Sequence, residues 1–121
     1  LNANYLAERL EMDVPFGPFH HEFAATAGDR DAADVAKRML DFGVHPPTTK
    51  WPEMVPEAML TEPTEIEGKS SLDDLAEAFN LAYADTDEAL DSAPNRTAAA
   101  RIDQVGAARD PRLSWQALDD D

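Results

Sequence analysis

The longest regular pattern of apolar side chains runs from Leu72 to Leu90 and predicts one amphipathic helix. Apolar residues recur there at steps of three and four, and the opposite face carries aspartate, glutamate and asparagine. Ser70 stands just before this stretch and Asp73 follows three residues later, which is the spacing of a capping box. We therefore expect a single helix over residues 72–90 that is capped by Ser70.

A second helix is expected over residues 32–42. Asp31 precedes it as a candidate N-cap, and Gly43 follows it where a left-handed C-terminal residue is common. Lys37 and Arg38 fall in its C-terminal half, where positive charge suits the helix dipole. The apolar stripe of this helix comprises Val35, Met39, Leu40 and Phe42.

Two short segments have the pattern of strands. Residues 21–27 alternate with Phe23, Ala25 and Ala27 on one face, and residues 57–62 form an apolar run that Pro63 ends. Helical spacing is also present at residues 3–12 and, weakly, at residues 98–105. This order of elements predicts an α+β fold in which a short sheet carries helices packed on one face.

The same pass along the chain divides it into three parts. Residues 1–12 are expected to be the end of an upstream helix, residues 13–91 a small α+β domain, and residues 92–121 a partly irregular C-terminal extension. The three final aspartates, residues 119–121, are expected to be disordered. Because the sequence starts at Leu1, inside a helical pattern, we interpret it as a fragment of a longer protein.

Composition limits the class of protein. The chain has 121 residues, of which 43% are apolar, so it can form one hydrophobic core. It contains no cysteine, no apolar run long enough for a membrane helix and no signal peptide. We expect a cytoplasmic protein without disulfides or thiolate metal sites.

Charge adds a second limit. The chain contains 25 acidic and ten basic residues, which gives a net charge of −15. Such a surface disfavours nucleic acid and anionic membranes as partners. Because the acids are spread over every segment and lysines are few, the composition indicates a halophilic protein whose self-repulsion is screened by abundant cations. An ordinary acidic domain is the alternative.

Candidate chemistry gathers in residues 44–56. Four prolines within eleven residues restrict this loop to few conformations. It presents an imidazole, two hydroxyls and an indole, and these groups suit the wall of a binding site. The candidate site residues are His45, Thr48, Thr49 and Trp51. The alternative is a structural loop whose prolines and tryptophan pack on another domain.

Seven ordered pieces of the sequence resemble a known family. The pieces are Asn2-Ala3-Asn4-Tyr5-Leu6, His21-Glu22-Phe23, Asp34-Val35-Ala36-Lys37-Arg38, Asp41-Phe42-Gly43, His45-Pro46-Pro47-Thr48, Trp51-Pro52 and Glu62-Pro63-Thr64-Glu65. With these pieces the chain is similar to the C-terminal small domain of glycine decarboxylase, the P-protein of the glycine cleavage system. Its tail, with Arg101-Ile102-Asp103, Ala107-Ala108-Arg109 and Leu113-Ser114-Trp115, resembles the end of subunit 2 in the two-subunit prokaryotic form.

The resemblance implies a reaction and its partners. Such an enzyme removes the carboxyl group of glycine as CO2 with the help of pyridoxal phosphate and passes the aminomethyl group to the lipoyl arm of the H-protein. Subunit 1 is the other implied partner. The lysine that holds the cofactor in this family lies in a histidine-lysine-threonine context, which is absent from this sequence. We therefore expect no catalytic and no cofactor-binding residue here, and an inactive fragment.

Several smaller features have bland interpretations. His20 and His21 are adjacent, and on a strand they would point to opposite faces, so a shared metal site is not expected. The arginines of the tail, Arg96, Arg101, Arg109 and Arg112, are expected to pair with acidic surface of this chain or of a partner, with Trp115 as an anchor.

Two further expectations concern the surface of the chain and its class. Tyr5, Trp51 and Trp115 are expected to lie in an exposed apolar patch through which the fragment self-associates or binds subunit 1. From a different class, the chain could be a non-enzymatic acidic α+β domain that serves interaction or regulation.

Overall fold

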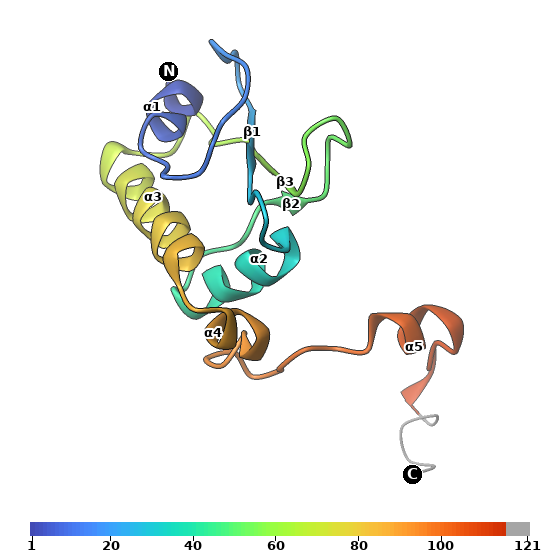
Figure 1. Ribbon diagram of the computed structural model, residues 1–121. Coiled ribbons are helices and arrows are strands. Elements are labelled where there is room, and N and C mark those ends of the chain that lie inside the picture. Colours follow the sequence, from blue (N-terminus) through green and yellow to red (C-terminus); the bar gives the residue numbers. More distant parts are fainter. Residues whose placement is uncertain (116–121) are drawn as a thin grey trace.

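A computed structural model describes residues 1–115 of the chain. Its three strands, β1 (Phe23–Thr26), β2 (Thr48–Thr49) and β3 (Ala58–Thr61), form one antiparallel sheet in the order β1-β3-β2. The helices are α1 (Asn2–Ala7), α2 (Ala32–Asp41), α3 (Lys69–Ala84), α4 (Asp87–Ser92) and α5 (Gln104–Arg109). Figure 1 shows α1, α2 and α3 gathered beside the sheet and α5 carried away from it.

The core confirms the predicted α+β class with helices on one face of a short sheet. Phe23 and Met59 point from the sheet into a buried cluster that also holds Leu6, Met39 and Phe79 from the three helices. The alternate strand residues Ala24 and Ala58 face the other side of the sheet, where Val55 of the loop after β2 packs against them. Alternation along the strands therefore assigns the large side chains to the helical face.

The strand predictions are confirmed in place and shortened at their ends. Phe23 pairs with Thr61, and Thr26 pairs with Ala58, so β1 and β3 run through the middle of the predicted segments. Strand β2 has only two residues, and no sequence pattern indicates it, because prolines surround it on both sides. It adds to β3 through Thr48, opposite Leu60.

Helix α2 agrees with its prediction at both ends. The Asp31 side chain accepts a hydrogen bond from the backbone N–H of Ala33, as an N-cap does. Gly43 has φ of 80°, which a residue with a side chain rarely adopts, and it turns the chain from α2 into the loop of candidate chemistry. Val35 and Met39 of the predicted stripe are fully buried, whereas Leu40 and Phe42 are half-buried.

The single helix predicted over residues 72–90 is wrong, because the chain forms two helices there. Asp85 is extended, with φ of −70° and ψ of 167°, and Thr86 caps α4 by accepting from the Ala89 N–H. The carboxylate of Asp85 accepts a hydrogen bond from Arg38 of α2. This contact fixes the extended residue Asp85 between the two helices. The apolar spacing continues across the break because α3 and α4 both pack on the same core.

The predicted capping box is also wrong. The N-cap of α3 is Gly68, which makes no side-chain cap, and Ser70 lies inside the first turn. Asp73 serves another purpose: it accepts hydrogen bonds from the Tyr5 hydroxyl at 2.6 Å and from Arg9 Nε at 3.2 Å. Asp73 therefore joins α1 to α3, and no local pattern could show that contact.

The two ends of the chain differ from their predictions. Helix α1 ends at Ala7, short of the predicted residue 12, and its residue Leu6 is fully buried. The predicted helix over residues 98–105 is wrong: α5 covers Gln104–Arg109, and Asp103 caps it by accepting from the Gly106 N–H. The prediction for residues 119–121 lies outside the described residues.

Candidate functional site

The loop after α2 forms one wall of a groove with a volume of about 640 Å³. Residues 44–47 of this loop line one side, residues 60–64 at and after the end of β3 line a second side, and residues of α3 between Ser70 and Phe79 line the rest. The prolines of the loop and the left-handed Gly43 fix this course. His45 is the only one of the four predicted site residues that lines the groove.

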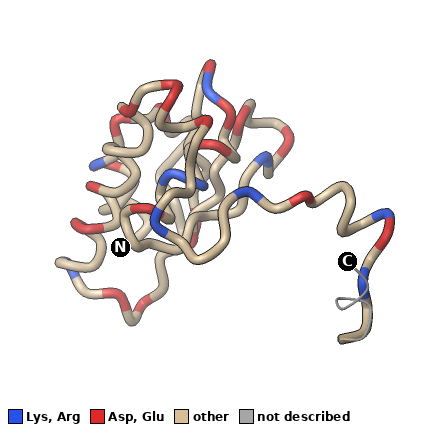
Figure 2. Tube along the Cα trace, turned by 90° about the horizontal axis from the view of Figure 1, so that it is seen from below, with Lys and Arg blue, Asp and Glu red and all other residues tan. Residues whose placement is uncertain are grey.

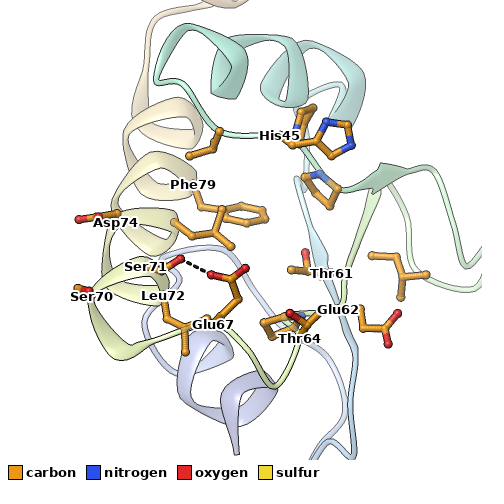
Figure 3. A pocket seen from close by; sticks show the side chains of 16 residues that line it. His45, Thr61, Glu62, Thr64, Glu67, Ser70, Ser71, Leu72, Asp74 and Phe79 are labelled. Atoms are coloured by element: carbon orange, nitrogen blue, oxygen red, sulfur yellow. Dashed lines mark hydrogen bonds between the residues drawn. The ribbon is translucent and has the colours of Figure 1, made fainter.

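Apolar side chains form the base of the groove and carboxylates its edge. Phe79, Leu72 and Leu75 of α3 line it from the helix side. Figure 3 shows Glu67 pointing into the hollow, where it accepts a hydrogen bond from the Ser71 hydroxyl. In the same view Ser70 and Asp74 lie on the outer side of α3 and point away from the hollow.

The groove thus has an acidic edge. Glu62 and Glu67 line it together with Asp74, whose carboxylate points outward, and His45 is the only basic side chain among the described residues of the lining. The Ser71 hydroxyl donates to a carboxylate within the wall, so it does not form the serine–histidine pair of a nucleophilic site.

The other predicted site residues lie along the same loop but outside the groove. Thr48 and Thr49 form β2 at the edge of the sheet. Trp51 follows two residues later and is 55% exposed. The structure therefore places the four residues in one continuous segment, and brings only His45 to the groove.

Lys50 is tied to its own chain. Its ammonium group contacts Asp31 at 2.8 Å and Glu57 at 3.7 Å, and Glu57 also accepts the Ala32 N–H at 2.8 Å. The hydrogen bond to Asp31 raises the pKa of Lys50 and lowers that of the Asp31 carboxyl. Since these two carboxylates occupy the N-terminus of α2, that helix end offers no free amides to a phosphate.

The lysines do not fit covalent attachment of a cofactor. A lysine that forms such a bond must lose its proton, and burial or a neighbouring cation usually lowers its pKa for this purpose. Lys50 and Lys69 instead have raised pKa values, chiefly through hydrogen bonds to Asp31 and Asp73 respectively. The third lysine, Lys37, lies half-buried on α2. We derive no cofactor chemistry from these residues.

A buried ionic cluster that no sequence pattern indicated lies at the C-terminal end of α2, around Asp41. Asp41 accepts hydrogen bonds from the backbone N–H groups of Asn95 at 2.6 Å and Arg96 at 2.7 Å, and from Arg38 at 2.9 Å. Burial by itself would raise the pKa of Asp41, but these donors outweigh it and hold the pKa below its ordinary value. Arg38 also binds Asp85, so the cluster joins α2 to both ends of α4.

The arginines of the tail lie partly on the folded body, residues 1–101, and partly on the arm that follows it, residues 102–115. Arg101 pairs with Asp34 of α2 at 2.8 Å and donates to the carbonyl groups of Ala93 and Leu90. This confirms the predicted pairing of the tail with acidic surface of the same chain for Arg101. Arg109 lies further along, in α5.

Other candidate features give no site. His20 and His21 precede β1 rather than lying on it, so the strand argument against a shared metal was wrong, and His21 contacts Glu22 at 3.9 Å. Within residues 1–115, no group of three or more His, Asp or Glu side chains is arranged to hold a metal ion. A search of the same residues finds no helix with the length and apolar character needed to cross a membrane.

The predicted apolar patch is not one surface. Tyr5 stacks under the guanidinium of Arg9, 3.4 Å from the ring centroid, and bonds to Asp73, so it belongs to the α1–α3 contact. Trp51 and Trp115 are both exposed, at 55% and 76%. They lie in different parts of the fold, one in the loop after β2 and the other beyond α5.

Comparisons with known proteins agree on one family. Residues 1–101 match the model for the domain described as "Glycine dehydrogenase, C-terminal domain". A protein of Halobacterium salinarum is 70% identical over 119 residues, which cover 98% of this chain and 25% of that protein. A protein of Thermotoga maritima is 44% identical, covering 96% of this chain and 27% of the relative. A third, from Thermoplasma volcanium, is 44% identical over 95% of this chain and 25% of its own length.

All three relatives are named "Probable glycine dehydrogenase (decarboxylating) subunit 2". The chain spans about a quarter of the length of these curated relatives. The similarity to a Halobacterium protein agrees with the halophilic composition expected from the charge.

Proposed function

Because the chain belongs to the family of glycine dehydrogenase C-terminal domains, we propose that it forms the C-terminal part of a glycine-decarboxylating subunit 2. The observation that carries this proposal is the family match over residues 1–101, together with 70% identity across nearly the whole chain. In the complete enzyme, pyridoxal phosphate would supply the means to stabilise the electron pair left when the glycine carboxyl group departs. The engaged lysines support a cofactor site upstream of this chain.

The part of this chain in that reaction is to shape the site. The loop that carries His45, Thr48, Thr49 and Trp51 is turned at its start by Gly43 and is held near its middle by the contact of Lys50 with Asp31. We propose that this loop forms one wall of the glycine pocket or of the channel for the lipoyl arm. Trp51 supplies exposed apolar surface, and His45 supplies an imidazole in the wall of the groove. Such positioning raises a rate without the wall itself reacting.

The proposal also names partners and a compartment. Relatives called subunit 2 belong to enzymes of more than one subunit, so subunit 1 is the first partner proposed for this chain. The second is the lipoylated H-protein, which receives the aminomethyl group. The proposed place of action is the cytoplasm of a halophilic cell.

The isolated chain is expected to form no stoichiometric adduct with pyridoxal phosphate at its lysines. Two of its three lysines, Lys50 and Lys69, are held protonated by carboxylates, which opposes attack on the cofactor aldehyde. The measurement is the mass of the chain after incubation with the cofactor and reduction with borohydride, with the complete subunit as a positive control. Stoichiometric labelling of one lysine in the isolated chain would refute the upstream cofactor site.

Truncation of the proposed wall should slow the complete enzyme. His45→Ala and Trp51→Ala are each expected to lower kcat/KM for glycine decarboxylation at least about tenfold, because they loosen the position of the reacting groups. Ile66→Ala is the matched control, since Ile66 is 84% exposed and lies outside the groove lining. Equal activities for all three variants would show that the loop is structural, as its alternative interpretation has it.

A further inference from the structure

Residues 102–115, which follow Arg101, form an arm whose apolar side chains are unusually exposed. Figure 1 shows this arm leaving the body after α4 and carrying α5 away from the sheet. Four of its apolar side chains lie open to solvent: Ile102 at 67%, Val105 at 59%, Leu113 at 88% and Trp115 at 76%. A protein in water seldom presents so many large apolar groups on one short segment unless a partner covers them.

The base of the arm is fixed, so the arm has a defined direction. Arg101 makes three contacts with the body: the Asp34 carboxylate at 2.8 Å, the Ala93 carbonyl at 2.9 Å and the Leu90 carbonyl at 2.7 Å. Asp41 binds the backbone of Asn95 and Arg96 just before this point. An arm anchored in this way loses less conformational freedom on docking than a free tail does.

The arm lacks the acidic excess of the rest of the chain. Residues 102–115 hold two arginines and two aspartates, whereas the whole chain holds 25 acidic against ten basic residues. Figure 2 shows acidic positions spread over the body, and both basic and acidic positions along the arm. An arm of balanced charge with exposed apolar groups fits an apolar recess, and arginine and tryptophan are the residues that anchor protein interfaces most often.

The comparisons indicate which protein would present that surface. The family domain ends its match at residue 101, where the arm begins. The relatives named subunit 2 nevertheless match 98%, 96% and 95% of the chain, so their similarity continues into the arm. The arm is therefore shared with proteins whose name implies a second, different subunit, and it lies outside the domain that defines the family.

We propose that residues 102–115 are a docking arm that binds the other subunit of the enzyme, with Leu113 and Trp115 inserted into an apolar recess on its surface. This inference rests on the proposed function, since that function supplies the second subunit. It assigns subunit recognition to the arm and leaves the groove beside His45 to the active site.

The test uses the complete subunit that contains this chain and purified subunit 1, in molar KCl. Replacing Leu113 and Trp115 together by Asp should weaken the binding of subunit 1 at least about 30-fold, as expected for the loss of an interface anchor. The matched control replaces Ile66 and Met54 by Asp, because these side chains are 84% and 74% exposed on the body. Binding is measured by titration calorimetry, and the melting temperature of each variant reports its folding.

Each outcome has one meaning. Weakened binding in the arm variant alone, at an unchanged melting temperature, supports the docking arm. Weakened binding with a lowered melting temperature shows instead that the arm packs on its own subunit, and overturns the inference. Equal binding by the arm variant and the control overturns it while leaving the two-subunit function intact. If the arm variant loses only self-association, the occupant is a second copy of the chain and the inference is wrong. If the unsubstituted subunit fails to bind subunit 1, the proposed two-subunit function fails together with the arm.

Discussion

Replacing Asp41 by Asn is expected to lower the free energy of unfolding of the isolated chain by about 3 kcal/mol. The Asp41 side chain is 1% exposed, and one of its oxygens receives the N–H groups of Asn95 and Arg96 while the other receives Arg38. An amide can still accept the two backbone bonds, but its NH2 group then faces the guanidinium of Arg38. The guanidinium of Arg38 loses its buried carboxylate partner, and its N–H donors then lie against the NH2 donor of the asparagine.

Thermal unfolding followed by circular dichroism measures this effect, with an expected fall in Tm of about 10 °C. Asp91→Asn is the matched control, since Asp91 is an exposed residue of α4 and its change removes the same charge. The control should be neutral or slightly stabilising, because it reduces the net charge of −15. Equal effects of the two substitutions would show that the Asp41 cluster has no special weight in the fold.

The same cluster sets a dependence on pH. The pKa of Asp41 is lower in the folded chain than in the unfolded chain, where it is about 3.9. Its contribution to stability is therefore complete above the unfolded pKa and is lost as the pH falls through the folded pKa. The difference in stability between the Asp41→Asn variant and the unsubstituted chain should accordingly shrink below about pH 4.

The second large effect is that of salt. Raising KCl from dilute buffer toward molar concentration should stabilise the chain by on the order of 2 kcal/mol, which corresponds to a rise in Tm of about 8 °C. At least six of the ten basic residues form ion pairs within the described part of the chain, namely Arg9, Arg30, Arg38, Lys50, Lys69 and Arg101. The surplus carboxylates repel one another over the whole body.

Screening acts on both the repulsion and the ion pairs, so their sizes decide the sign. An exposed ion pair contributes only about 0.2–1 kcal/mol, and salt removes part of that. Repulsion among 25 acidic residues sums over many more pairs of charges, so screening stabilises the chain more by relieving this repulsion than it destabilises the chain by weakening ion pairs. A Tm that stays constant or falls between dilute and molar KCl would contradict the halophilic interpretation. Sodium sulfate is not a suitable substitute for KCl, because sulfate also strengthens apolar burial.

Patterns within one segment predicted the fold best where the cause was local. The N-cap at Asp31, the left-handed Gly43 and the strand at β3 follow from side chains next to them in sequence, and all three are present. The α+β class followed from the order of these elements. Because apolar periodicity reports only which face is buried, it placed the core side chains of α3 correctly and missed the break at Asp85.

Contacts between distant segments account for the errors. Asp73 fits a capping box by spacing, yet Tyr5, 68 positions away, donates its hydroxyl hydrogen bond to this carboxylate. In the sequence, Asp41 is only part of a family motif. Its structural role depends on the backbone N–H groups of Asn95 and Arg96, which folding brings beside it. A single sequence gives no information on such pairs, since each partner alone resembles an ordinary surface residue.

The candidate site shows the same division. Sequence patterns placed chemistry in the loop that holds His45 and Trp51, because prolines and functional groups are concentrated there. They missed the opposite wall, where Glu67, Ser71 and Leu72 line the groove from the start of α3. Folding brought that wall to the loop, and no motif linked the two segments.

Release of labelled CO2 from carboxyl-labelled glycine tests the proposed function most directly. The complete subunit that carries this chain is mixed with subunit 1, pyridoxal phosphate and lipoylated H-protein in molar KCl, and each component is omitted in turn. We expect release from the full mixture, its loss when either subunit or the cofactor is omitted, and none from the isolated chain. A complete, folded and cofactor-loaded mixture that releases no CO2 from glycine would contradict the proposed function.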